Sequence, residues 1–454
     1  MFDLQRFRRS VAYTTFVVFF GLSVDLTTYG VVVTVIPFRL NSLGYNDIPS
    51  KSSILVSAYG AGLILSSIPC GILGEVFRKR KVTLLSGLLF LVGGSIIFLF
   101  SKCFALLVIA RVIQGFSGTI VWTIGFALIC DKVPESQLAS VIGYVMMGWS
   151  LGALVGPLVG GALYDSLGFN SILIFNLILA AVDFTFRLFL LEEKKIKIEL
   201  KKPPRGDKPE VQLAKNTTKS IELPSNTQSG SQAVSNKISS SNAYLALLRS
   251  PRCGILFFLV FGLGFTFGGL FDGGITLTLN NRYGLLSREA GLVYIAVAFP
   301  PFVSSPLIGF IVGKAGAKWP IVICLIIGAP LLGLQALNIR LWGLVLLVAL
   351  ISFVVMSTST PILEDLSQVA RENPKIGYAH VYSAFNMVYS IGSLLGLLCI
   401  GALLQNYGIE KGWKIGCIIC SSYLGALIIP AIFLIGRNSK KRNINIKNPI
   451  FSKP

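Results

Sequence analysis

A few polar side chains interrupt the long apolar stretches of this chain, and their types could bind an ion or move a proton. Asp25, Arg111, Gln114 and Asp272 are the candidates. A charge held in hydrocarbon costs roughly 2.5 kcal/mol or more, so each must face a cavity, find a partner or change its protonation state. Asp25 lies near the centre of its stretch, where a carboxylate can exchange a proton for a cation. We expect ion exchange here, and neither a catalytic set nor a metal site.

Each candidate also has a structural interpretation. Asp25 could accept a hydrogen bond between two helices, and Asp272 could cap a helix near the membrane surface. Arg111 could form a static ion pair, since a buried arginine must be paired. We favour proton or substrate binding for Asp25 and leave both interpretations open for Asp272. Arg111 would also suit an anionic substrate, whereas the two carboxylates favour a cation.

The composition places these side chains in a membrane protein. The 454 residues are 53% hydrophobic and 13% charged, against roughly 25% charged in an average soluble domain, and the mean hydropathy is +0.74. This excludes a soluble enzyme or binding domain. Twelve apolar stretches recur, each expected to be long enough as a helix to cross the ~30 Å hydrocarbon layer. The expected spans are 11–38, 53–76, 82–100, 105–129, 139–163, 171–191, 254–279, 290–312, 319–337, 342–363, 377–404 and 413–436.

The basic residues set the expected orientation of the spans. The chain has 40 Lys and Arg against 20 Asp and Glu, a formal net charge of +20. With both termini in the cytoplasm, most of these cations fall in cytoplasmic loops and tails, as membrane proteins prefer. Topology therefore accounts for the positive charge, and we expect no nucleic-acid partner.

Two parts of the chain resemble each other. The segment SLGALVGPLVGGALYDSLGF from Ser150 aligns with SIGSLLGLLCIGALLQNYGI from Ser390. Internal repeats of spans are typical of secondary transporters, which bind substrate between the repeats and expose it to one side at a time. The Lys-, Ser- and Pro-rich sequence between them predicts a disordered cytoplasmic linker. The expected domains are a six-helix half at 1–191, the linker at 192–252, a second six-helix half at 253–437 and a cytoplasmic tail at 438–454.

Six motifs occur in order along the expected spans. They are VDLTTYGVVVTVIPF, GILGEVFRKRKVTLLSGL, ARVIQGFSGTIVWTIGFALICD, SLGALVGPLVGGALYD, FDGGITLTLNNRYG and SPLIGFIVGKAGAKW. With them the chain resembles the major facilitator superfamily, specifically its twelve-span drug–proton antiporters and the related vesicular amine transporters, most of all the fungal members. The resemblance implies an all-α membrane protein of twelve helices in two pseudo-symmetric halves.

The resemblance also implies roles for individual residues. The first-helix Asp25 matches the acid that vesicular amine transporters use, and the Arg111 position is implicated in proton coupling in the family. The implied gating loop comprises Gly71, Glu75, Arg78, Arg80 and Lys81, with Asp131 as its partner. The implied antiporter motif comprises Gly152, Gly156, Pro157, Gly160 and Gly161. Glycines at 148, 152, 156 and 160 share one helix face, so close helix packing is the alternative interpretation.

The chain departs from the family pattern at several positions. Glu75 replaces the usual Asp of the gating loop, and Gly313 replaces the acid of its second copy, which puts gating by that copy in doubt. Asn386 stands where vesicular amine transporters carry an acid. The fungal drug antiporters also have an asparagine at this position.

Other charged pairs are expected to be structural or solvated. Asp183 and Arg187, four residues apart, predict a pair on a helix surface. Glu364 and Asp365 are expected to be solvated near the cytoplasm.

These observations predict a proton-coupled antiporter of small, cationic or amphipathic organic molecules, such as drugs or amines, that works by alternating access. A proton gradient would replace any cofactor, and a monomer in the plasma or vacuolar membrane is expected. The alternatives are a nutrient symporter or facilitator and a non-transporting sensor that signals through its linker. The suggested cavity residues are Asn176, Tyr382, Asn386 and Tyr389.

Overall fold

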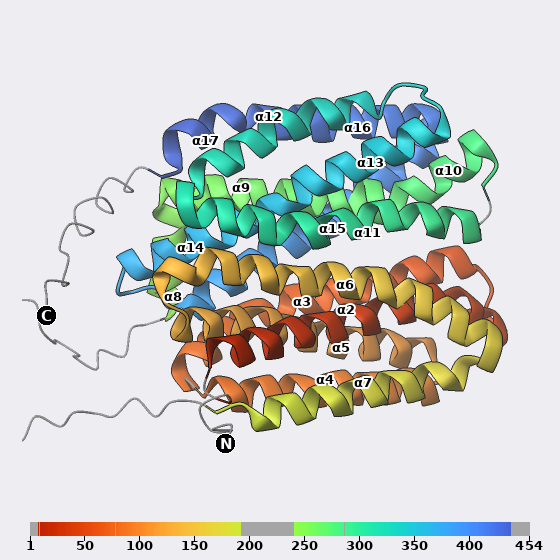
Figure 1. Cartoon of the computed structure of the whole chain (residues 1–454). Helices are drawn as coiled ribbons and strands as arrows, with labels where there is room; N and C mark the ends of the chain where they lie inside the picture. Colours follow the sequence, from red (N-terminus) through yellow and green to blue (C-terminus); the bar gives the residue numbers. More distant parts are fainter. Residues whose placement is uncertain (1–7, 9, 78, 192–239, 286, 437–454) are drawn as a thin grey trace, which may run out of the picture.

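The computed structural model describes residues 8, 10–77, 79–191, 240–285 and 287–436 (Figure 1). The described residues are helical throughout the apolar stretches and contain no strand. The first half comprises α2 (Val11–Ser42), α3 (Ile48–Phe77), α4 (Arg80–Phe100), α5 (Phe104–Lys132), α6 (Glu135–Leu167) and α7 (Phe169–Phe189).

The second half is preceded by a short helix, α8 (Ser240–Arg249). Its helices are α9 (Pro251–Thr266), the π-helix η1 (Phe267–Gly274), α10 (Ile275–Tyr283), α11 (Ser287–Ala315), α12 (Lys318–Leu334), α13 (Leu341–Val355), the 3-10 turn η2 (Met356–Thr358), α14 (Ser359–Glu372), α15 (Tyr378–Tyr407), α16 (Ile409–Ala426) and α17 (Ile428–Leu434). Several of these join into single spans, such as Pro251–Tyr283 and Leu341–Glu372.

The apolar helices confirm an integral, multi-pass membrane protein. Among the described residues, 11 helices are long and apolar enough to cross a membrane, and α12 is a shorter apolar helix. The count of twelve spans therefore stays a prediction. In Figure 1 the helices run roughly side by side, with α2–α7 forming one half of the bundle and α9–α17 the other.

Segments on both sides of the expected linker lie at one end of the bundle, on the left in Figure 1. Lys132 at the end of α5 donates to the Leu191 carbonyl at 2.8 Å, and α8 lies at this end too. We call it the linker end. The expected disordered linker at 192–252 is described only from Ser240 onward, and its last part is helical (α8 and the start of α9) instead of disordered.

Small residues bring α6 close to α2. A Cβ added at any of the glycines at 148, 152, 156 and 160 would overlap backbone atoms of α2. Pro157 packs against Gly30 in the same contact. Because lipid is as apolar as a leucine side chain, membrane helices associate through such close packing. Gly161, assigned to the same motif, faces open space and takes no part in this contact.

A valine at Gly156 should therefore destabilise the bundle, whereas a valine at Gly161 should not. Its side chain would collide with Gly30 and the Thr27 carbonyl on α2, and overpacking of this kind costs about 1–3 kcal/mol. Thermal unfolding of the purified variants measures the difference. Equal midpoints for Gly156→Val and Gly161→Val would contradict the packing described.

Candidate functional site

A cavity lies between the two halves of the bundle. Its walls come from α2, α3, α5 and α6 on one side and from η1 and α15 on the other. It holds about 980 Å³ of space free of atoms, counted with its open mouth. Its position suits a site between transporter halves.

Asp25 on α2 faces this cavity from the first half. Its side chain is only 3% exposed, and its Oδ2 accepts a 3.0 Å hydrogen bond from the Tyr59 hydroxyl on α3. Gly118 on α5 leaves room for this bond, since a Cβ there would meet both groups. Asp25 Oδ1 has no hydrogen-bond partner among the described residues. One carboxylate oxygen is therefore fixed and the other is available.

Asp272 on η1 faces the same cavity from the second half. Its side chain is exposed to the cavity, and its Oδ1 accepts a 2.8 Å hydrogen bond from Tyr294 on α11. Gly268 and Gly269 let this segment lie directly against the backbone of α15. A π-helix is a rare, widened turn that occurs often at functional sites, and nothing in the sequence pattern predicted it. Thus each half contributes one tyrosine-bonded carboxylate.

Arg111 on α5 lies behind the cavity wall and not in it. The guanidinium is fully buried, donates to Gln114 Oε1 at 2.7 Å and lies 3.3 Å from the Leu55 carbonyl. It lies 5.2 Å from the ring centre of Tyr29 and 5.1 Å from that of Tyr59. No ion pair joins it to a carboxylate in the part of the chain that the structure describes. The alternative interpretation, a static ion pair, is therefore not seen there.

Aromatic rings and one amide close the cavity toward the linker end. Trp122 of α5 stacks on Phe385 of α15 with ring centres 5.7 Å apart. Asn386 donates to Ser67 Oγ at 3.1 Å and to Thr119 Oγ1 at 3.2 Å, so one side chain of the second half binds two helices of the first. These contacts hold the two halves together at the end of the cavity nearer the linker end.

The gating-loop residues form a second closure nearer the linker end. Glu75 Oε1 accepts from the Ala379 backbone N–H at 2.8 Å, so a carboxylate of the first half sits at the N-terminus of α15, where the helix dipole favours it. Arg80 pairs with Glu75 at 3.2 Å and with Asp131 at 3.0 Å. Lys81 donates to the Leu188 carbonyl at 2.6 Å, and Arg78 lies outside the described residues.

Helix α8 adds a contact that the sequence did not predict. The Tyr244 hydroxyl lies 2.8 Å from Ser383 Oγ on α15 and 3.3 Å from the Ile68 carbonyl on α3. Its ring meets His380 edge to face at 5.3 Å. Gly71 of the gating loop leaves the space that this hydroxyl occupies. Tyr244 therefore bridges the two halves from the helical last part of the expected linker.

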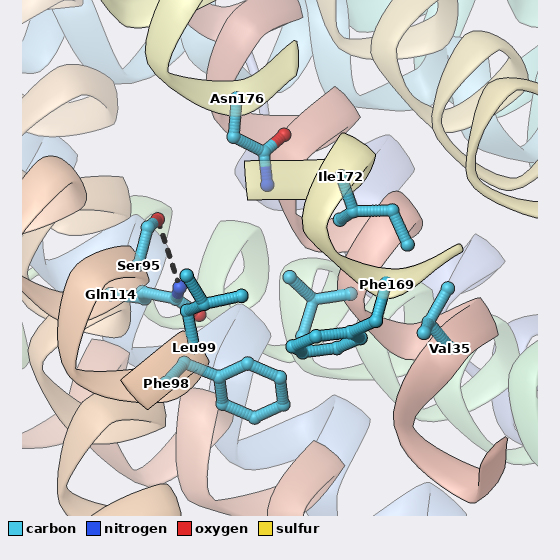
Figure 2. A pocket seen from close by; sticks show the side chains of 9 residues that line it. Val35, Ser95, Phe98, Leu99, Gln114, Phe169, Ile172 and Asn176 are labelled. Carbon is cyan, nitrogen blue, oxygen red and sulfur yellow. Dashed lines mark hydrogen bonds between the residues drawn. The ribbon is translucent and has the colours of Figure 1, made fainter. Parts of the chain in front are cut away.

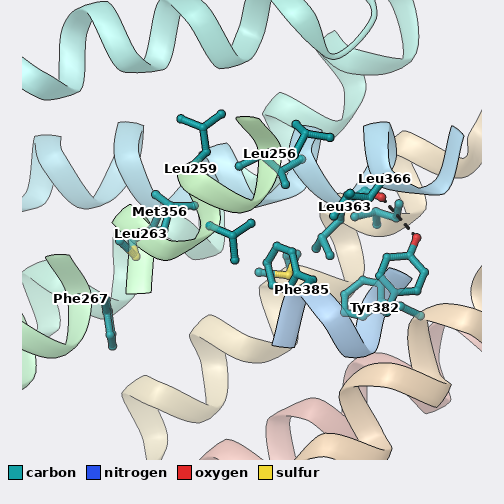
Figure 3. Packing of buried hydrophobic residues seen from close by; sticks show 14 of the residues in the cluster. Leu256, Leu259, Leu263, Phe267, Met356, Leu363, Leu366, Tyr382 and Phe385 are labelled. Carbon is teal, nitrogen blue, oxygen red and sulfur yellow. Dashed lines mark hydrogen bonds between the residues drawn. The ribbon is translucent and has the colours of Figure 1, made fainter. Parts of the chain in front are cut away.

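Two residues suggested for the cavity lie elsewhere. Tyr382 is fully buried below the cavity, where its hydroxyl lies 3.0 Å from Cys130 Sγ and donates to the Leu363 carbonyl at 3.3 Å (Figure 3). Asn176 lines a separate small pocket inside the first half, together with Gln114 and Ser95 (Figure 2). Asn386 and Tyr389 do line the cavity. All four were candidates because they are polar side chains within apolar spans, and polarity alone could not tell which of them lie at the cavity.

Two charged pairs are buried instead of solvated. Asp183 and Arg187 are 0% and 1% exposed and pair through two hydrogen bonds of 3.1 and 2.6 Å. Glu364 and Asp365 are 1% and 2% exposed. The expected exposure was wrong in both cases. For Asp183 and Arg187, a spacing of four residues fixes a shared helix face but not what covers that face. For Glu364 and Asp365, a position near the end of a span does not show which helices pack over it.

Asp365 forms an ion pair within the second half. Its carboxylate pairs with Arg252 at 2.6 Å, and this fixes the start of α9 against α14.

Comparisons with known proteins identify the family of this chain. The model of the Major Facilitator Superfamily matches residues 15–396. An uncharacterised MFS-type transporter of Schizosaccharomyces pombe is 27% identical over 94% of this chain and 96% of its own length. The human MFS-type transporter SLC18B1 is 23% identical over 81% of this chain and 72% of its own length.

The fold has a solved counterpart. The crystal structure of the human organic anion transporter MFSD10 (TETRAN) superposes with a TM-score of 0.69 and 18% identity, over 94% of this chain and 99% of that one. This likeness concerns the fold alone. With the family match over most of its length, the chain belongs to the Major Facilitator Superfamily and is a membrane transporter.

Proposed function

We propose that this transporter is a proton-coupled antiporter of small organic cations or amphipathic molecules. The observation that carries the proposal is the cavity itself, in which Asp25 and Asp272 from opposite halves face one space. Aromatic side chains, among them Tyr29, Trp122 and Trp149, form much of its wall. Carboxylates beside aromatic faces attract organic cations through charge and through cation–π contacts.

Asp25 supplies the exchange step. Its carboxylate is buried, and its free Oδ1 can hold either a proton or a cationic group of the substrate. Both ligands neutralise the same charge, so the binding of one favours the release of the other. Each pH unit of gradient provides about 1.4 kcal/mol for this exchange. Exclusive occupancy of one carboxylate is sufficient for antiport.

Alternating access requires the halves to separate at the linker end. Three contacts between halves close that end: Asn386 with Ser67 and Thr119, Glu75 with the N-terminus of α15, and Tyr244 with the Ile68 carbonyl. Few other polar contacts join the halves in the described residues. Loss of the three contacts named above would therefore allow one half to rock against the other. The cytoplasmic position of both termini, the monomeric state and the choice of membrane stay predictions.

Substrate class is the least constrained part of the proposal. The Mycobacterium tuberculosis protein named drug efflux pump JefA is 28% identical over 30% of this chain, and its name supports export of drug-like molecules. An anionic substrate would need access to Arg111, which the cavity wall covers. The antiporter motif on α6 argues against a nutrient symporter.

A non-transporting sensor is the alternative from another class. Such a protein would show no pH-dependent flux in a purified system, because its output depends on partners of its linker. Flux in liposomes therefore separates the two.

Asp25→Asn should abolish flux driven by a pH gradient in proteoliposomes. The amide is close in shape to the carboxylic acid but can neither ionise nor pair with a cation. Uptake of a fluorescent organic cation, started by a pH jump, measures the effect, and we expect at least a tenfold loss of initial rate. Asp47→Asn, at an exposed position between α2 and α3, is the matched control and should keep the parent rate.

Two outcomes would contradict the mechanism. One is full coupled flux in Asp25→Asn. The other is the absence of gradient-driven flux in the parent protein for every organic cation screened, which would favour the sensor.

Tyr244→Phe should shift the conformational equilibrium away from closure at the linker end. The change removes one hydroxyl that bridges the halves, and a hydrogen bond of this kind contributes about 1 kcal/mol, equivalent to about a fivefold shift in population. Spin labels at the exposed positions Lys79 and Lys375, in a background without the exposed Cys103 and Cys399, report the separation of the halves. We expect Tyr244→Phe to increase the population of molecules in which the two labels are farther apart.

Tyr423→Phe is the control for this experiment. Its hydroxyl donates to the Phe258 carbonyl at 2.9 Å within the second half, so its loss should leave the distance distribution unchanged. Identical distributions for Tyr244→Phe and the parent would show that α8 does not hold the closed end.

A further inference from the structure

A buried positive charge lies directly behind the wall of the cavity. Arg111 is fully buried and does not line the cavity, whereas Tyr29 and Tyr59 do. Both rings contact the guanidinium, at 5.2 and 5.1 Å from ring centre to carbon. They also contact each other, with centres 4.6 Å apart. The two tyrosines together form a continuous cover between the arginine and the cavity, which we call the tyrosine cover.

The guanidinium forms no ion pair in the described part of the chain. Its hydrogen-bond partners, Gln114 Oε1 and the Leu55 carbonyl, are neutral, and its Nη2 has no hydrogen-bond partner there. A cation that only neutral groups contact keeps its charge, so it repels other cations and attracts anions in a nearby cavity. The π faces of the two rings offset part of this charge and keep a substrate at a distance from it.

Tyr59 also serves the opposite charge. Its hydroxyl donates to Asp25 Oδ2 at 3.0 Å while its ring faces Arg111. This position needs the space left by Gly118. One side chain thus presents the carboxylate to the cavity and screens the guanidinium from it.

We propose that the tyrosine cover sets the charge selectivity of the cavity. With Tyr29 and Tyr59 in place, Asp25 and Asp272 are the charges that a substrate meets, and the cavity selects cations. Without the rings, Arg111 becomes part of the wall, so cations bind less well and anions bind better. The inference deepens the proposed function by naming the residues that decide the substrate's sign of charge.

Two probes of the same size and opposite charge test this proposal. Tetraphenylphosphonium and tetraphenylborate share four phenyl groups, so packing affects both alike and charge separates them. Their dissociation constants are measured on the full-length protein in lipid nanodiscs. We expect Tyr59→Leu to weaken binding of the cation and strengthen that of the anion, and to change the ratio of the two constants at least tenfold.

Further variants separate the ring from the hydroxyl. Tyr59→Phe keeps the ring over Arg111 and should keep most of the parent's ratio. Tyr29→Leu leaves the hydrogen bond between Tyr59 and Asp25 intact and should change the ratio in the same direction as Tyr59→Leu. Arg111→Gln in the Tyr59→Leu background should restore the preference for the cation. The thermal midpoint of each variant shows that it is folded.

Tyr389→Leu is the matched control, because Tyr389 lines the cavity but makes no contact with Arg111. It removes one aromatic ring without uncovering Arg111, so it should change the ratio of the two dissociation constants much less than Tyr59→Leu does. The proposal is overturned if Tyr59→Leu and Tyr29→Leu change the ratio no more than Tyr389→Leu does, or if Arg111→Gln fails to restore the ratio. The readout is equilibrium binding without a pH gradient, so it stands or falls separately from proton coupling.

Discussion

A charge within the hydrocarbon layer must be compensated where it lies, and the arrangement of this transporter follows from that constraint. Different partners compensate the different buried charges. Asp183 neutralises Arg187 inside the first half, and Arg252 neutralises Asp365 at the linker end of the second. Among the described residues, Asp25 alone combines burial, a cavity-facing position and a carboxylate oxygen without a hydrogen-bond partner. The residues with ion-pair partners hold helices together, whereas we propose that this carboxylate binds exchangeable ligands.

For alternating access, each half of the bundle must move as a rigid unit, and the two halves must be able to separate at one end. Within the first half, glycines of α6 lie against the backbone of α2, a contact that resists sliding. Between the halves, polar contacts gather at the linker end, where Glu75 reaches α15 and Asn386 reaches α3 and α5. Each such contact joins few atoms and contributes about 1 kcal/mol. Close packing also joins the halves, because a Cβ at Gly143 of α6 or at Gly309 of α11 would overlap the facing backbone of the other helix. The balance of states therefore depends on this packing as well as on the polar contacts.

Sequence reasoning predicted an all-helical membrane protein from length and hydropathy, and it singled out Asp25 and Asp272 because each is a charge within an apolar stretch. The structure has such helices and brings both carboxylates to one cavity. Sequence reasoning could not identify Tyr59, because the role of this residue depends on its hydrogen bond to Asp25 on another helix. It also placed Tyr382 and Asp183 wrongly. In soluble proteins polarity marks the exposed face of a helix, but lipid is as apolar as the protein core. Apolar residues thus surround these helices, and periodicity does not show which face meets lipid and which meets a neighbour.

The central claim is that a proton and an organic cation compete for Asp25. Proton release on binding tests this directly, without a membrane gradient. Purified protein in weakly buffered nanodiscs is mixed with tetraphenylphosphonium while the pH is recorded. The account predicts that cation binding releases protons from the parent protein and none from Asp25→Asn. Cation binding with no proton release from the parent, or with equal release from Asp25→Asn, would contradict it.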